Sequence, residues 1–110
     1  MKRTGLMFAV LLGSATVSLP AHAESFQEGM QLICQSPKQA KVESLRDRSK
    51  QLTTAAKWID EHLRNREARQ VFDSLPPLEL VEKAAKVREA AYKAGISECP
   101  LADLWAAPSR

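Results

Sequence analysis

Two cysteines, Cys34 and Cys99, and one histidine, His62, are the residues after position 23 that could act as nucleophiles or as soft metal ligands. A metal site would need more thiols or imidazoles, and no C-x-x-C motif for redox exchange or haem attachment occurs. Nucleophilic catalysis needs a thiol or hydroxyl held against a base. Ser49 lies on the same predicted helix as His62 but about three and a half turns away, too far to be its partner.

Residues 1–23 have the pattern of a cleavable bacterial-type export signal. Two bases follow the initiating methionine, residues 6–12 form an unbroken apolar run, and the Ala-His-Ala triplet that ends at Ala23 has the small-x-small pattern accepted by signal peptidases. The apolar run is too short to span a bilayer, which takes about 20 residues. We expect cleavage between Ala23 and Glu24. The mature domain, residues 24–110, would then have no membrane span and would be periplasmic or secreted.

Export would place Cys34 and Cys99 where thiols oxidise, so one intramolecular disulfide is expected. The bond would close a loop of about 66 residues, for which the chain-entropy model gives roughly 4 kcal/mol of stabilisation. This is a large share of the total stability of a small domain, about 5–10 kcal/mol. The disulfide would leave no free thiol, and a mature chain of 110 − 23 = 87 residues can rarely enclose the concave site that catalysis needs, so we predict no enzymatic activity and no cofactor.

The net charge argues against a nucleic-acid partner. The whole sequence has sixteen Lys and Arg against thirteen Asp and Glu, a net charge of +3. Removal of residues 1–23 takes away Lys2 and Arg3, which leaves 110 − 23 = 87 residues with fourteen bases, thirteen acids and a net charge of +1. Such a chain lacks the basic excess that attracts nucleic acids. Its length allows one domain with one modest core.

Apolar residues recur at helical spacing throughout the mature chain, which predicts an all-α fold, a small bundle of about four helices closed by one disulfide. The first predicted helix covers residues 25–35, with Ser25 and Glu28 in a capping box, and Pro37 suits the first turn of the next helix. The helical pattern then continues from Pro37 to Arg64. This segment is either one unusually long helix or two helices with a break around residues 46–50.

The rest of the chain contains clear signals for helix ends. Asn65 is the predicted N-cap of a third helix over residues 66–74. The proline pair that follows predicts its end and the start of a fourth helix, which runs to about Ala94. Gly95 then occupies the position that favours a left-handed residue. Pro100 begins a short final turn.

Helical periodicity also predicts which residues face the core. In the long segment they are Val42, Leu45, Ser49, Leu52, Ala56, Ile59 and Leu63. In the fourth helix a broad arc is predicted to be buried, consisting of Leu80, Val81, Ala84, Ala85, Val87, Ala91 and Tyr92.

Gln51, Trp58 and His62 share a stripe beside the predicted core face of the long segment. In a structural interpretation, Trp58 closes the edge of the core and His62 stacks beside it. The alternative is a binding patch for a ligand or partner, extended by Trp105, in which the histidine adds sensitivity to pH.

Arg88 falls inside the predicted apolar arc, one turn before Tyr92. A buried guanidinium is unfavourable unless it is paired and hydrogen-bonded. We therefore predict a buried ion pair with Asp60, Asp73 or Asp103. Otherwise this face of the helix meets a partner.

Small size, export, a single disulfide and helical structure make the chain similar to the acid-stress chaperones of the bacterial periplasm, an architectural resemblance without a shared motif. The leading prediction is a non-enzymatic periplasmic binding or interaction module whose partner is another periplasmic or envelope protein. The first alternative is a stress or chaperone-like protein whose helices open to expose apolar surface. The second is a small enzyme or cofactor carrier.

Overall fold

The computed structural model describes residues 23–107, so the predicted export signal lies outside the described residues apart from its last residue, Ala23. The described chain is helical and contains no strand, which confirms the all-α prediction. Its elements are α1 (Phe26–Gln39), the 3₁₀ turn η2 (Val42–Ser44), α2 (Arg48–His62), α3 (Arg66–Asp73), α4 (Leu80–Lys93) and the short α5 (Pro100–Ala106).

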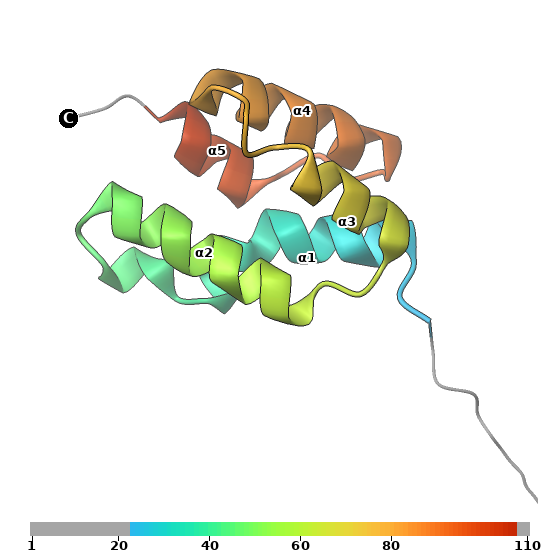
Figure 1. Cartoon of the computed structure of the whole chain (residues 1–110), viewed down its shortest axis with the longest axis horizontal. Coiled ribbons are helices and arrows are strands. Elements are labelled where there is room, and N and C mark those ends of the chain that lie inside the picture. The colour runs from blue at the N-terminus through green and yellow to red at the C-terminus, as the bar shows by residue number, and fades with distance from the viewer. Residues whose placement is uncertain (1–22, 108–110) are drawn as a thin grey trace, which may run out of the picture.

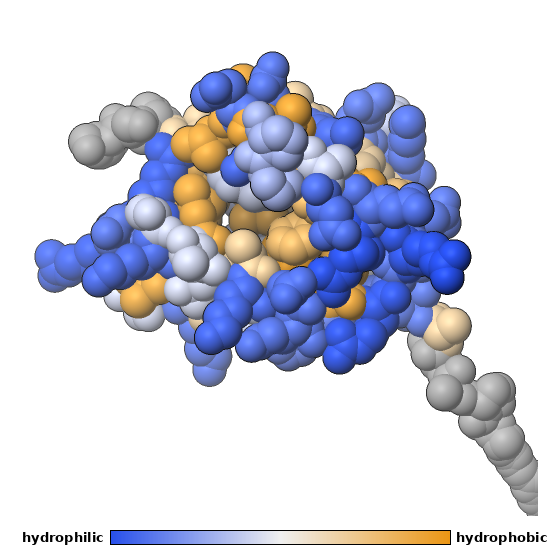
Figure 2. Space-filling model, viewed as in Figure 1, coloured by the Kyte–Doolittle hydropathy of each residue, from blue (hydrophilic) through white to orange (hydrophobic). Residues whose placement is uncertain are grey.

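Helix α1 is the centre of the bundle and contacts each of the other four helices (Figure 1). Helix α2 lies beside α1, whereas α4 and α5 pack against each other and against α1. Figure 2 shows that polar residues cover most of the face seen in Figure 1, with apolar residues gathered around a hollow near its centre, between α2 and α5. The bundle is therefore organised around α1, with α2, α3 and the α4–α5 pair all packed against it.

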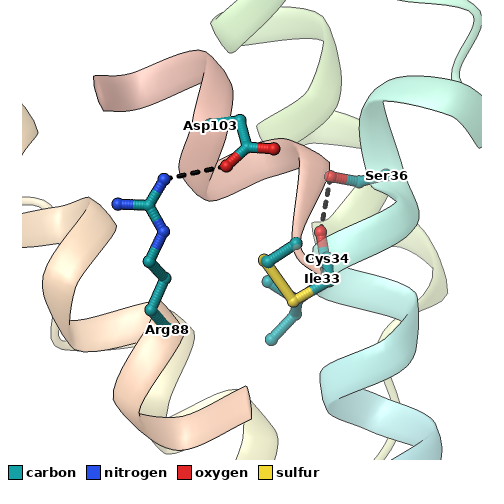
Figure 3. Close-up of a disulfide and its surroundings, with 6 residues drawn as sticks. Ile33, Cys34, Ser36, Arg88 and Asp103 are labelled. Carbon is teal, nitrogen blue, oxygen red and sulfur yellow. Dashed lines mark hydrogen bonds and ion pairs between the residues drawn. A yellow bond between two sulfur atoms is a disulfide. The ribbon is translucent and has the colours of Figure 1, made fainter. Parts of the chain in front are cut away.

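The predicted disulfide is confirmed: Cys34 on α1 is bonded to Cys99, the residue that precedes α5. Cys34 is completely buried, and the Cα atoms of the two residues are 4.4 Å apart. Residues 65 positions apart in the sequence are thereby joined, so that the first and last helices of the bundle are covalently tied (Figure 3).

The prediction that the first helix ends at Gln35 is wrong, because α1 continues through Pro37 to Gln39. Proline has no N–H, so the carbonyl of Ile33 lacks its usual helical donor. The Ser36 hydroxyl donates to that carbonyl instead, at 2.8 Å, and the bond lies in the buried interior (Figure 3). Ser36 thus supplies the hydrogen bond that Pro37 cannot make, and the helix passes the proline.

The segment from Pro37 to Arg64 forms two helices with a break between them, at residues 40–47. Lys41 has a left-handed backbone with φ of 56°, and the turn η2 follows it. Helix α2 then begins at Arg48, with the Asp47 carboxylate accepting the Ser49 N–H at 2.8 Å. The break precedes most of the range predicted for it.

The core face of α2 differs from the predicted one because the helix starts after the break, in a new register. Ile59 and Leu63 are buried as predicted. Ala55 is also buried, whereas Ser49 and Ala56, which were predicted to face inward, are exposed.

Helix α3 packs close to α1 at a contact between small residues. A Cβ atom built on Gly29 would lie 2.6 Å from the Cβ of Ala68, closer than two carbon atoms can approach. Asn65 caps α3 as predicted, accepting the Ala68 N–H at 2.8 Å. The Glu24 carboxylate accepts the N–H groups of Arg64 and Asn65, at 3.0 and 2.7 Å, and so ties the chain before α1 to the α2–α3 junction.

Helix α4 begins at Leu80, later than predicted, with Glu79 as N-cap residue. Its end is as predicted: Gly95 has φ of 82°, and the Ile96 N–H donates to the Ala91 carbonyl at 2.8 Å. This is the arrangement expected of a helix that ends in a left-handed glycine.

The predicted buried arc of α4 is only partly correct. Ala84, Val87 and Ala91 are buried, but Val81 and Tyr92 are 71% and 80% exposed. The reason is that α4 packs mainly against α1 and α5, which leave much of its surface uncovered. The rest of the apolar arc forms part of the molecular surface.

Candidate functional site

A groove of about 1170 Å³ lies between the C-terminal part of α1, α4 and α5. Pro37 and Val42 line it from the side of α1 and η2. Ala85 and Tyr92 line it from α4, and Leu104 lines it from α5. Two other surface hollows of the described chain hold about 370 and 380 Å³.

Two features of the sequence create this groove. The continuation of α1 past Pro37 places that residue and η2 opposite α4. The disulfide then fixes the start of α5 against α1, and Cys99 itself lines the groove. The walls are therefore held by the covalent tie and by the central helix.

The groove has a local excess of negative charge. The charged residues that line it are Glu43, Glu89, Glu98, Asp103, Lys38 and Arg88. Four carboxylates against two bases leave a net charge of −2. Glu89 lies 3.8 Å from Lys93 in an ion pair. Glu43 and Glu98 make no ion pair within residues 23–107.

Arg88 pairs with Asp103, one of its three predicted partners, at 2.8 Å between Nη2 and Oδ1 (Figure 3). The pair is not buried, however, because the two side chains are 48% and 71% exposed. The prediction of a buried ion pair is wrong for the same reason as the wide apolar arc: this face of α4 is not covered by another helix of the bundle.

Trp58 and His62 form a stacked pair on α2. Their ring centroids are 4.3 Å apart, and the ring planes are inclined by 19°. The His62 Nδ1 atom lies 2.8 Å from the Trp58 carbonyl oxygen. Trp58 is half-buried and His62 is exposed, so the tryptophan covers the edge of the bundle with the imidazole beside it.

The other two residues of the predicted binding patch lie elsewhere. The Gln51 side chain lines the groove and donates to the Leu45 carbonyl at 2.6 Å, which holds the segment before α2. Trp105 is only 8% exposed and belongs to the core. Its carbonyl accepts a bond from the Arg48 guanidinium at 2.7 Å, which links α2 to α5. The four residues therefore do not form one surface.

Several residues that line the groove were predicted to be core residues or were not singled out, among them Ala85, Tyr92 and Glu98. One signal in the sequence could have indicated them. The apolar arc predicted for α4 is wider than the face a helix usually buries against one or two neighbours, and it contains a charged residue, Arg88.

The described chain has little that could perform covalent or metal chemistry. Cys34 and Cys99 are both in the disulfide. Residues 23–107 contain no group of three or more His, Cys, Asp or Glu side chains that could hold a metal ion. In the same part of the chain no helix is long and apolar enough to cross a bilayer. The groove itself offers shape, apolar contact and charge, the features of a binding surface.

The fold and the groove define the chain as a small helical bundle, closed by one disulfide, with a concave surface across its first and last helices. No family model matches the sequence, and no curated protein or solved structure matches it either.

Proposed function

We propose that the protein is an exported, non-enzymatic binding module that engages another periplasmic or envelope protein through the groove between α1, α4 and α5. The observation that carries this proposal is an apolar groove beside a tyrosine, Tyr92, that is 80% exposed. Large aromatic side chains at the edge of an apolar depression are typical of interaction surfaces. Pockets for small ligands usually measure about 300–1,000 Å³ and enclose most of the ligand's surface. A groove of about 1170 Å³ with exposed walls suits a segment of a protein better.

Export is supported by two independent features. The pattern of residues 1–23 is that of a cleavable signal. The disulfide between Cys34 and Cys99 needs a compartment in which thiols oxidise. Together they favour the periplasm or the extracellular space as the place where the groove meets its partner.

A binding role is favoured over catalysis by the surroundings of the one histidine of the predicted mature chain. His62 stacks on Trp58 at the end of α2. The hydroxyl residues of the same helix are Ser49, Thr53 and Thr54. All lie eight or more positions before His62, at least about 12 Å along the helix axis, too far for the imidazole to activate them as nucleophiles. The disulfide takes the thiols out of nucleophilic chemistry.

Site-specific photo-crosslinking in cells tests the proposal. A photoreactive phenylalanine derivative is placed at position 92, in the groove, or at position 66, exposed on α3 and outside it. A discrete adduct of higher mass is expected from position 92 and not from position 66. Absence of an adduct at position 92, or equal yields at the two positions, would exclude the groove as the binding surface.

The chaperone-like alternative is favoured by the carboxylates that link different helices. Asp60 on α2 pairs with Arg69 on α3 at 2.6 Å, and Asp103 on α5 pairs with Arg88 on α4 at 2.8 Å. Acidification to about pH 3 protonates carboxylates and removes such contacts. A chaperone of this kind should lose near-ultraviolet dichroism and gain protection of an aggregating client over the same titration. If neither changes, this alternative fails.

A further inference from the structure

The charges around the groove indicate the chemistry of its partner. Resting on the proposed function, we infer that the groove receives a basic amphipathic segment of the partner protein, with apolar side chains that enter the groove and Lys or Arg residues beside them.

The accessible apolar part of the groove comes mainly from the α4–α5 side. Ile96 and Leu104 are half-buried against the core, whereas Val42 on the α1 side is buried. Tyr92 stands exposed at the edge. A segment that lies along the groove can therefore insert apolar residues between α1 and α4, as an amphipathic helix does in a hydrophobic groove.

The negative charge is a property of the groove and not of the whole molecule. Residues 23–107 have thirteen bases, sixteen less Lys2, Arg3 and Arg110, and all thirteen acids, so they are neutral overall. The side chains that line the groove nevertheless have a net charge of −2. The excess is concentrated where the apolar surface is, which is the combination that a basic amphipathic segment complements.

Two carboxylates are available to a partner on opposite sides of the groove. Glu43 lies in η2, and Glu98 lies between α4 and α5. Both are exposed, and neither forms an ion pair within the described chain. Lys38 lies on the same side as Glu43 and offsets part of its field. A second copy of the chain that docked groove to groove would bring an equally acidic surface, and anionic surfaces in general would be repelled, so a basic partner is favoured.

The inference is tested by fluorescence anisotropy with a defined probe. The probe is a labelled helical peptide of about 18 residues made of Leu and Lys, with Leu on one face. A matched peptide has Glu in place of Lys. We expect the purified, oxidised protein to bind the Lys peptide at least about tenfold more tightly, with an affinity that falls when salt is raised from about 0.1 to 1 M.

Charge reversal identifies the residues responsible. Glu43→Lys combined with Glu98→Lys should weaken binding of the Lys peptide about tenfold, because two favourable charge contacts become repulsive. The control, Glu61→Lys with Asp73→Lys, changes the net charge by the same amount on exposed residues outside the groove. This control variant should bind the Lys peptide with the affinity of the unaltered protein.

Other outcomes would overturn the inference. These are equal binding of the two peptides, binding of neither, equal weakening in both double variants, or a dimer in sedimentation that only the groove variant abolishes. If neither peptide binds but a photo-crosslinker at position 92 still yields its adduct, the partner chemistry is wrong and the binding role stands. If neither peptide binds and the photo-crosslinker at position 92 yields no adduct, the binding role itself is refuted.

Discussion

Arg88 illustrates how solvent exposure determines how much an ion pair contributes to stability. In the sequence it interrupts an apolar pattern, which predicts a buried guanidinium with a strong structural partner. In the structure it pairs with Asp103 in contact with solvent, where water and salt screen the attraction. Such a pair contributes little to stability, and under the proposed function it could rearrange on binding of a partner in the groove.

Substitution Arg88→Met should therefore change the free energy of unfolding by less than about 1 kcal/mol, the usual range for an exposed ion pair. Urea denaturation measures the change. Arg69→Met is the comparison: the Arg69 guanidinium also donates to the carbonyl oxygens of Asp60 and Leu63, both at 3.0 Å. Arg69→Met should lower the free energy of unfolding by more, about 1–3 kcal/mol. A loss of about 3–5 kcal/mol for Arg88→Met would mean that the pair is buried after all.

Gly29 is a residue for which helix propensity and packing oppose each other. Alanine is favoured over glycine inside a helix by about 1 kcal/mol. Here, however, the added Cβ would meet the Ala68 Cβ at 2.6 Å and the Asn65 Cβ at 3.1 Å. Backbone atoms would have to move, and overpacking of this kind usually destabilises by about 1–3 kcal/mol.

We predict a net loss of stability for Gly29→Ala, measured by thermal or urea denaturation. Ala68→Gly in the same chain removes the opposing methyl group and should restore part of the loss. A more stable Gly29→Ala protein would show that α1 and α3 are not in close contact.

At the scale of elements, the helix ends that were predicted correctly are determined by local signals in the sequence. Asn65 at the start of α3 and Gly95 at the end of α4 act through bonds to residues a few positions away, so the sequence contains the necessary information. Pro37 led to the wrong prediction for the end of α1 because the effect of this proline depends on Ser36, whose hydroxyl replaces the missing backbone donor.

The parts of the candidate site that could not be predicted depend on packing between distant elements. Periodicity identifies an apolar arc on α4, but the positions of the neighbouring helices, mainly α1 and α5, decide which part of the arc is covered. Val81 and Tyr92 thus changed from predicted core to surface. The groove itself arises where three segments meet, and no short sequence pattern encodes such a meeting.

The passage of α1 through Pro37 gives a prediction at this scale. Ser36→Ala would leave the buried Ile33 carbonyl without a donor and should destabilise the protein by about 1–3 kcal/mol in urea denaturation. In a Pro37→Ala background the new backbone N–H can reach that carbonyl, so the same Ser36 substitution should matter much less. Equal losses in the two backgrounds would contradict the role assigned to the Ser36 hydroxyl.

At the scale of the molecule, the decisive feature is that α1 contacts the other four helices of residues 23–107 and is bonded to Cys99 at the start of α5. A domain of this size has a modest core, and one covalent tie is a large part of its stability. The same tie holds one wall of the groove, so stability and the proposed binding role depend on one bond.

Replacing Cys34 and Cys99 by serine, or reducing the disulfide, should lower the free energy of unfolding by about 4 kcal/mol. Denaturation midpoints of the oxidised and reduced protein measure this loss, with an alkylation assay to verify the state of the thiols. Identical midpoints would mean that the non-covalent packing of α5 on α1 maintains the stability of the bundle without the disulfide.

The central claim, that the groove is the binding surface, is tested most directly by filling it. Ala85 and Ala56 are exposed helical alanines, the first in the groove and the second outside it. Ala85→Trp and Ala56→Trp are compared for the yield of the adduct from a photo-crosslinker at position 92. We predict that Ala85→Trp reduces the yield at least about tenfold at an unchanged melting temperature, because a bulky side chain occupies the space of a partner anchor, and that Ala56→Trp leaves the yield as it is. Equal yields from the two variants would contradict the account.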